Sequence, residues 1–243
     1  MNTTVTKGYR FVLFTLLFIL GIGAERIGLV GYFSDPWEQE YILHLVRQHL
    51  YLVSVSMAMA IAAGLAAGIL VSRKRLQKYS GIVMYVIGLG QTIPSLAVLA
   101  LVMSFLGIGS RPAIFALFIY STLPVARNTL AGILSVSPAI IDAARGIGMR
   151  PAQILWQVEL PNALNVILTG VRVALVINIG TAALGYLIGA GGLGDLIFTG
   201  INLMQPDKLL AGALPVVAMA LIADYLVALF GVIVIPKGIR LAG

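Results

Sequence analysis

Long uncharged, apolar runs alternate with short basic stretches along the chain, and this pattern predicts an all-α protein that crosses a membrane about six times. A run of 20 or so apolar residues is long enough to cross about 30 Å of hydrocarbon as a helix. The first run, residues 11–24, has only 14 residues, but apolar residues resume after it. We therefore expect an uncleaved first helix and not a signal peptide. Four further spans are expected at about residues 50–72, 112–133, 166–188 and 209–235.

Residues 79–110 form the remaining span, and they are uncharged over 32 positions, which is more than one straight helix requires. Pro94 lies inside this run, where it removes a backbone donor and clashes with the preceding turn. We expect a bent or broken helix here, with its freed backbone groups covered by protein or facing a water-filled path.

The composition excludes a soluble domain. The chain is 60% hydrophobic and 10% charged, whereas an ordinary soluble domain is about 25% charged. Cysteine is absent, which excludes disulfides and thiolate catalysis. The two histidines, His44 and His49, are expected to be interfacial or solvated. The net charge of +7 lies in loops beside apolar spans, so membrane orientation explains it better than nucleic-acid binding does.

The distribution of lysine and arginine orients the six spans. Eleven of the 16 basic residues fall on one side when both termini lie in the cytoplasm, four fall on the other side, and Arg172 lies within a span. This predicts a multi-pass membrane protein with both termini in the cytoplasm. Residues 142–161 are then also cytoplasmic.

Residues 142–161 are amphipathic and punctuated by glycine, unlike a short polar connection between spans. We expect a helix-turn-helix outside the bilayer that binds a protein partner; the alternative is an ordinary helical hairpin. Gly148 can take the left-handed conformation that ends a helix. Pro151 suits the first turn of the next helix, and Pro161 is expected to end that helix. Arg145 and Arg150 flank the turn.

The spacing of Asp142-Ala143-Ala144, Gly148, Val158 and Leu160-Pro161 resembles the EAA loop of the permeases of bacterial ABC importers, with Asp for the usual Glu and Val for the usual Ile. This resemblance implies a type I ABC importer (MetI-like) permease fold over residues 1–243, located in a bacterial inner membrane. Its cytoplasmic coupling segment would span about residues 137–165. The residues that would dock the ATPase are Asp142, Ala143, Ala144, Arg145, Gly148, Leu160 and Pro161.

No nucleotide-binding motif is present, so the resemblance implies a transport subunit that is not an enzyme and holds no cofactor or metal. ATP and magnesium would act in separate ABC ATPase subunits. The other implied partners are a second permease subunit, identical or paralogous, and an extracytoplasmic substrate-binding protein. No nucleic-acid partner is expected.

Two further segments suggest the substrate class. Residues 91–96 (QTIPSL) and residues 179–183 (IGTAA) resemble the osmoprotectant permeases for glycine betaine, carnitine and choline. Permeases of methionine importers carry a related Gly-Gly-Leu-Gly turn, so methionine or another small amino acid is the alternative. An ATP-independent secondary carrier would need inverted repeats and midplane ion ligands, and it would leave residues 142–161 unexplained. An intramembrane enzyme is disfavoured because no cluster of acids, bases and nucleophiles lies in the spans.

A dense glycine turn, made of Gly189, Gly191, Gly192 and Gly194, precedes the last span. It lacks the Lys and Ser/Thr of a phosphate-binding loop. We expect a flexible re-entrant turn, and its glycine density indicates close packing or motion. It would contact the binding protein or close the outer end of the pathway.

Arg172 and Asp224 are charges inside predicted spans, where each costs about 2.5–3.5 kcal/mol on insertion scales. They either form an intramembrane ion pair or extend separately to the inner interface.

Overall fold

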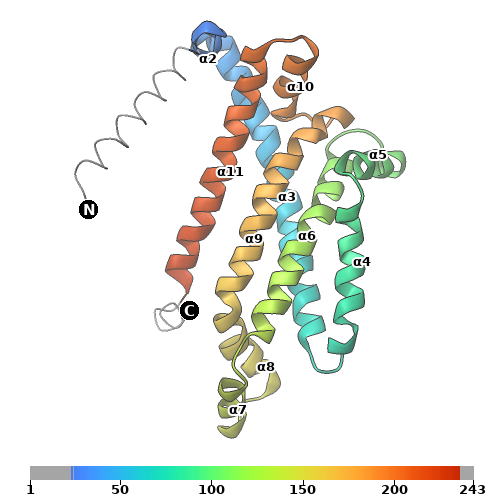
Figure 1. Cartoon of the computed structure of the whole chain (residues 1–243), viewed down its shortest axis with the longest axis vertical. Coiled ribbons are helices and arrows are strands. Elements are labelled where there is room, and N and C mark those ends of the chain that lie inside the picture. The colour runs from blue at the N-terminus through green and yellow to red at the C-terminus, as the bar shows by residue number, and fades with distance from the viewer. Residues whose placement is uncertain (1–22, 24, 236–243) are drawn as a thin grey trace, which may run out of the picture.

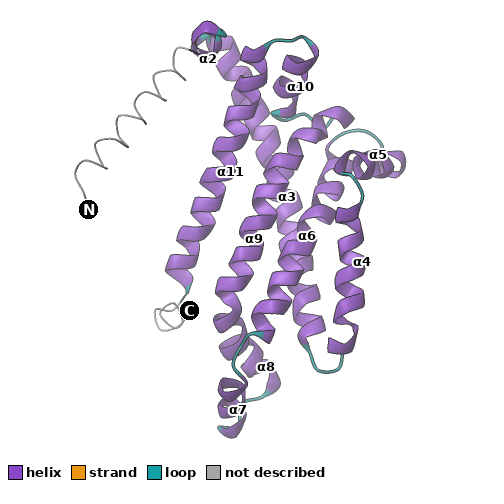
Figure 2. Cartoon of the chain, viewed as in Figure 1, coloured by secondary structure: helices purple, strands orange, loops and turns teal. Residues whose placement is uncertain are grey.

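The computed structural model describes residue 23 and residues 25–235, and the described chain consists of helices and turns without a strand (Figures 1 and 2). Four of its helices are long and apolar enough to cross a membrane, and a fifth span results if one sharply bent pair counts as a single crossing. The first expected span, residues 11–24, lies outside the described residues apart from Gly23. The long helices are α3 (Pro36–Ser72), α6 (Ser110–Leu134), α9 (Leu160–Ala182) and α11 (Pro206–Val234), and a short helix α2 (Leu29–Ser34) precedes them.

The span that contains Pro94 is broken, as predicted. Helix α4 (Ser80–Thr92) and helix α5 (Ser95–Leu106) meet at an angle of 95°, and α5 turns away from the bundle axis (Figure 1). Tyr120 of α6 bonds to residues on the α4 side of the break. The Tyr120 hydroxyl donates to the Ile93 carbonyl, and the Tyr120 backbone carbonyl accepts from Gln91 Nε2 at 2.7 Å. The Ile93 carbonyl at the break thus has a hydrogen-bond partner within the protein, which a backbone group inside a membrane requires.

Helix α3 begins 14 residues earlier than the expected span, at Pro36 instead of residue 50. The Asp35 side chain caps it by accepting from the Trp37 N–H at 2.9 Å, and Pro36 occupies the first helical position. A charge-free window detects the membrane-embedded part of a helix and not its full length. At 1.5 Å per residue, the extra part extends α3 by about 20 Å.

Helix α6 lies between α3 and α9 in the centre of the bundle. A Cβ added to Gly64 or Gly68 of α3 would lie 2.7 Å from Val125 Cβ or 2.5 Å from Thr129 Cβ, so only glycine allows this approach of the two helices.

A buried polar cluster also joins these three helices. Asn178 Nδ2 of α9 donates to Ser56 Oγ of α3 at 3.0 Å and to Ser121 Oγ of α6 at 2.8 Å, and all three residues are fully buried. The cluster satisfies the amide inside an otherwise apolar bundle.

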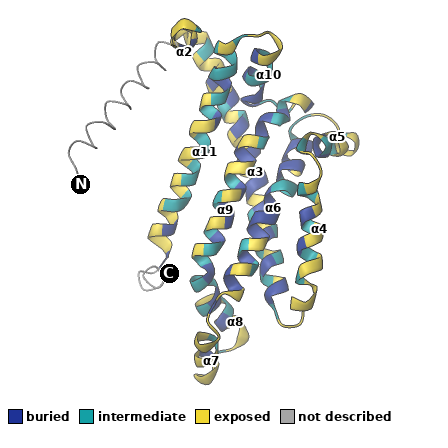
Figure 3. Cartoon of the chain, viewed as in Figure 1, coloured by how far each residue is buried: buried dark blue, intermediate teal, exposed yellow. Residues whose placement is uncertain are grey.

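Helix α11 is predominantly apolar, yet few of its residues are buried (Figure 3). Such a surface is typical of a helix surrounded by lipid or by other spans.

The prediction for His49 was wrong. His49 is fully buried, and its Nε2 lies 2.9 Å from the Ile179 carbonyl oxygen. The reason is the extension of α3 beyond the expected span, which places this turn of α3 beneath the glycine turn. His44 is exposed, and its Nε2 lies 3.0 Å from Gln48 Nε2.

Candidate functional site

The segment that resembles the EAA loop projects from one end of the bundle as two short helices, α7 (Pro138–Gly146) and α8 (Pro151–Ile154) (Figure 1). Gly148 has a φ of +81°, the left-handed conformation that the sequence predicted, and its N–H donates to the Arg145 carbonyl at 2.9 Å. Pro151 opens α8, and Gln153 Oε1 accepts from the Arg150 N–H at 2.8 Å. The turn is therefore fixed by local backbone chemistry.

Pro161 does not end the second helix, so that prediction was wrong. Helix α8 continues through a π-helical turn (Leu155–Glu159) into α9, and one continuous helical run extends over Pro151–Ile188. Within the π-helical turn the Leu160 N–H bonds to the Leu155 carbonyl, five residues back. This wider turn accommodates a proline that cannot donate its own hydrogen bond.

The predicted docking residues divide into two groups. Asp142, Ala143, Arg145 and Gly148 are exposed at the tip of the segment, while Ala144 is buried and Leu160 and Pro161 are half-buried where α9 begins. Arg145 Nη1 pairs with Asp142 Oδ1 of the same helix at 2.9 Å, so these two charges neutralise each other at the surface. Such an exposed pair contributes at most about 1 kcal/mol.

The tip also exposes large apolar side chains. Ile147 is 81% exposed and Trp156 is 68% exposed. Since residues 142–161 were predicted to lie outside the bilayer, these side chains make the tip a surface suited to a protein partner.

Sequence reasoning missed the ion pair that holds the base of this segment. Arg73, at the end of α3, places Nη2 2.5 Å from Glu159 Oε2, and Glu159 is buried within the π-helical turn. The same guanidinium nitrogen donates to Ser72 Oγ at 2.7 Å. The pair borders a cleft of about 890 Å³ between the ends of α3 and α6 and the helices α7 and α8. The available signal was Glu159 itself, an acid amid apolar neighbours.

The glycine turn lies at the opposite end of the bundle from α7, beside a helix that no sequence pattern predicted, α10 (Gly194–Asn202) (Figure 1). Gly189, Gly191 and Gly192 have φ values of +74°, +75° and +86°. The Gly192 N–H donates to Gln48 Oε1 of α3 at 2.9 Å. A Cβ on Gly194 would lie 1.8 Å from the Ala183 carbonyl oxygen. The turn is thus closely packed on α3 and on the 3-10 turn Ala183–Ile188, and close packing is one of the two properties that its glycine density indicated.

Arg172 and Asp224 form the ion pair that was one of the two expectations for these residues. Arg172 Nε and Nη2 donate to the two Asp224 carboxylate oxygens, each at 2.7 Å. This two-point geometry fixes orientation as well as distance. It joins α11 to α9 within the apolar part of the bundle.

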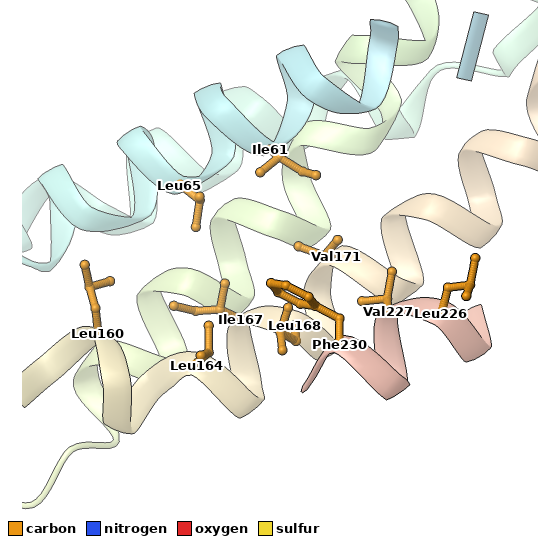
Figure 4. Close-up of a pocket in the computed structure, with 10 residues that line it drawn as sticks. All are labelled: Ile61, Leu65, Leu160, Leu164, Ile167, Leu168, Val171, Leu226, Val227 and Phe230. Atoms are coloured by element: carbon orange, nitrogen blue, oxygen red, sulfur yellow. The ribbon is translucent and has the colours of Figure 1, made fainter. Parts of the chain in front are cut away.

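An apolar groove of about 500 Å³ separates α9 and α11 on the side that faces α3 (Figure 4). Its lining carries no polar side chain, so it offers nothing to hold a polar solute. Within the described part of the chain, no group of three or more His, Asp or Glu side chains is placed to hold a metal ion.

Comparison with known proteins decides the family. Residues 60–232 match the family model described as the binding-protein-dependent transport system inner membrane component. The chain belongs to this family. It is accordingly the permease component of an ABC transporter, located in the inner membrane, and not a catalytic enzyme.

Several curated permeases are similar over most of their length. The Osmoprotectant import permease protein OsmY of Salmonella typhimurium is 47% identical over 95% of this chain and 97% of its own. The Carnitine transport permease protein OpuCB of Listeria monocytogenes is 43% identical over 79% of this chain and 88% of its own. The Choline transport system permease protein OpuBB of Bacillus subtilis is 38% identical over 82% of this chain and 91% of its own.

Solved structures confirm the predicted fold. An inward-facing structure of the MetNI methionine ABC transporter superposes with a TM-score of 0.68 at 23% identity, covering 86% of this permease and all of that chain. An amino acid ABC transporter crystallised with histidines gives the same TM-score at 21% identity, covering 82% of this permease and 96% of that chain. The all-α type I importer permease fold expected from the sequence is therefore confirmed.

Proposed function

We propose that this permease moves a small solute with a quaternary ammonium group, of the glycine betaine, carnitine and choline class, into the cytoplasm. The supporting observation is its 38–47% identity to relatives named for osmoprotectants, carnitine and choline. The methionine transporter shares the fold at only 23% identity. Methionine is the weaker alternative for this reason.

ATP and magnesium act in a separate ATPase subunit in this proposal. The docking surface is the exposed tip formed by Asp142, Ala143, Arg145 and Gly148, with Ala144, Leu160 and Pro161 supporting it from the bundle side. The exposed apolar side chains of the tip support this role, because a partner would cover them. Both termini and the tip lie in the cytoplasm, as the basic residues predict.

The other partners are a second permease subunit and an extracytoplasmic binding protein that delivers the solute. The glycine turn at Gly189, Gly191, Gly192 and Gly194 lies on the extracytoplasmic side in this topology. There it contacts the binding protein or closes the outer end of the pathway. Its close fit against α3 supports a role in which the turn and α3 move together.

Force would pass from the ATPase to the outer end through two connections. The continuous helix Pro151–Ile188 carries a displacement of the tip along α9. The Arg73–Glu159 ion pair carries the same displacement to α3, on which the glycine turn rests. Closure of the ATPase subunits would in this way change the packing of α3 and α9 around α6.

Reconstituted transport tests the proposal. The permease, its ATPase and its binding protein would be placed in liposomes, and uptake of labelled glycine betaine, carnitine, choline and methionine measured with and without ATP. We expect uptake of at least one of the three quaternary ammonium compounds that requires both ATP and the binding protein, and no uptake of methionine. Uptake of methionine alone, or uptake driven by an ion gradient without the ATPase, would contradict the proposal.

A further inference from the structure

A cavity of about 350 Å³ lies at the end of the bundle that carries the glycine turn, where α2, α10 and the first turns of α3 and α11 meet. Its volume falls within the range of about 300–1,000 Å³ found for small-molecule sites, and it opens to the surface at Trp37, which is 83% exposed. Three aromatic residues, two carboxylates and one ammonium line it: Tyr32, Trp37, Tyr41, Glu38, Asp195 and Lys208. The proposed topology places this end outside the cell membrane.

The extension of α3 beyond the expected span positions half of this lining. Trp37 and Tyr41 are four residues apart, so they lie on one face of the helix. Glu38 stands in the first turn, beneath the Asp35 cap. Burial, and after it the neighbouring Glu38 carboxylate, raises the pKa of Tyr32, so its hydroxyl stays protonated. The aromatic lining is therefore neutral and its ring faces remain electron-rich.

The remaining lining comes from α10 and α11, far along the chain. Asp195 lies in the first turn of α10, where its carboxylate interacts with the Tyr41 hydroxyl and accepts from Thr199 Oγ1 at 3.5 Å. Lys208 stands near the start of α11, and no carboxylate oxygen lies within 4.0 Å of its Nζ among the described residues. With two carboxylates against one ammonium, the cavity carries a net negative charge.

A quaternary ammonium group cannot donate a hydrogen bond from its nitrogen, so a site recognises it through aromatic faces and negative charge. The cavity offers both. A solute that also carries a carboxylate would find a cation for that end in Lys208. Glycine betaine and carnitine carry such a carboxylate, and choline carries a hydroxyl instead.

We propose that this cavity is a receiving site, where the quaternary ammonium solute binds to the permease after it leaves the binding protein and before it passes between the spans. The proposal rests on the substrate class proposed above and adds residues to it. Asp195 and the three aromatic residues hold the cation, and Lys208 separates the zwitterionic solutes from choline.

Direct binding to the permease tests this site. The complex of permease and ATPase would be placed in lipid nanodiscs without the binding protein, and the Kd for glycine betaine and for choline measured by saturation-transfer NMR. Loss of one cation–π contact, in Trp37→Ala or Tyr41→Leu, should raise the Kd for both solutes by about 2- to 30-fold, equivalent to roughly 0.5–2 kcal/mol. Lys208→Met should raise the Kd for glycine betaine and should not raise that for choline, because choline has no carboxylate and loses only a repelling cation. Tyr51→Leu, an exposed tyrosine on the same helix outside the cavity, is the matched control and should change neither.

Three outcomes would overturn parts of the account, and they can be told apart. Wild-type complex that imports glycine betaine but gives the same Kd in every variant, or shows no direct binding, would remove the receiving site alone. Unchanged solute binding together with weaker affinity of the Trp37 and Tyr41 variants for the binding protein would make this surface a protein contact and would also overturn the site. A wild-type complex that imports none of the quaternary ammonium compounds would overturn the proposed function and the ligand assigned here with it.

Discussion

Gly148→Val is expected to lower the affinity of the permease for the ATPase by about 5- to 150-fold. Most uptake should be lost, while the permease still inserts into the membrane. Gly148 has a φ of +81°, and a β-branched residue in that conformation costs about 1–3 kcal/mol. An added Cβ would meet no atom within 4 Å in this chain, so the effect would arise from the backbone and from the partner surface, and not from an internal clash. Copurification of the ATPase and uptake at equal permease abundance are the measurements.

Two neighbouring changes make this result specific. Gly148→Asn should retain more activity than valine, because asparagine adopts the left-handed conformation more readily. Gly146→Val, at a helical position that also has open space within this chain, separates conformation from added bulk. Full uptake by Gly148→Val at normal abundance would count against the coupling role.

At the opposite end of the molecule, Gly194→Ala should cause the largest loss of stability and uptake. Its Cβ would lie 1.8 Å from the oxygen and 2.8 Å from the carbon of the Ala183 carbonyl, and backbone atoms cannot rotate away as a side chain can. The glycine turn would have to separate from the 3-10 turn, at a cost of at least about 1–3 kcal/mol. We expect a lower thermal midpoint and strongly reduced uptake. Copurification of the ATPase should persist, because the docking tip lies at the other end.

Gly180→Ala is the matched control for this prediction. It makes the same chemical change in α9, where a Cβ would meet no atom within 4 Å, and alanine there is expected to stabilise the helix by roughly 0.5–1 kcal/mol. Equal uptake by the two variants would show that the glycine turn is not closely fitted and would remove its proposed role in transport.

The sequence could predict features that a local physical rule determines. The described spans follow from the length of uncharged runs, and the break between α4 and α5 follows from Pro94, which cannot donate a backbone hydrogen bond. The left-handed Gly148 follows from its place at the end of a helix. The pairing of Arg172 with Asp224 was one of two expectations, because a charge in a span needs a partner or a path to water.

Features that depend on distant packing could not be predicted in this way. His49 is buried because the glycine turn, far later in the chain, lies over α3. The partnership of Arg73 with Glu159 requires knowing that the end of α3 meets the π-helical turn. The prediction that Pro161 ends a helix was wrong because proline usually interrupts helical hydrogen bonding, whereas here a π-helical turn precedes it and accommodates it. The aromatic cavity could not be predicted for the same reason, because its lining comes from four separate helices.

Site-specific photocrosslinking can show whether the segment of residues 142–161 docks a cytoplasmic ATPase, as we propose. A photoreactive residue would replace Ile147, which is 81% exposed at the tip, and in a second variant Ile108, which is 78% exposed at the opposite end of the bundle. We expect a covalent adduct with the ATPase subunit from position 147 and none from position 108. An ATPase adduct from position 108 alone, or no adduct from position 147 in a variant that still imports its solute with ATP, would contradict this proposal.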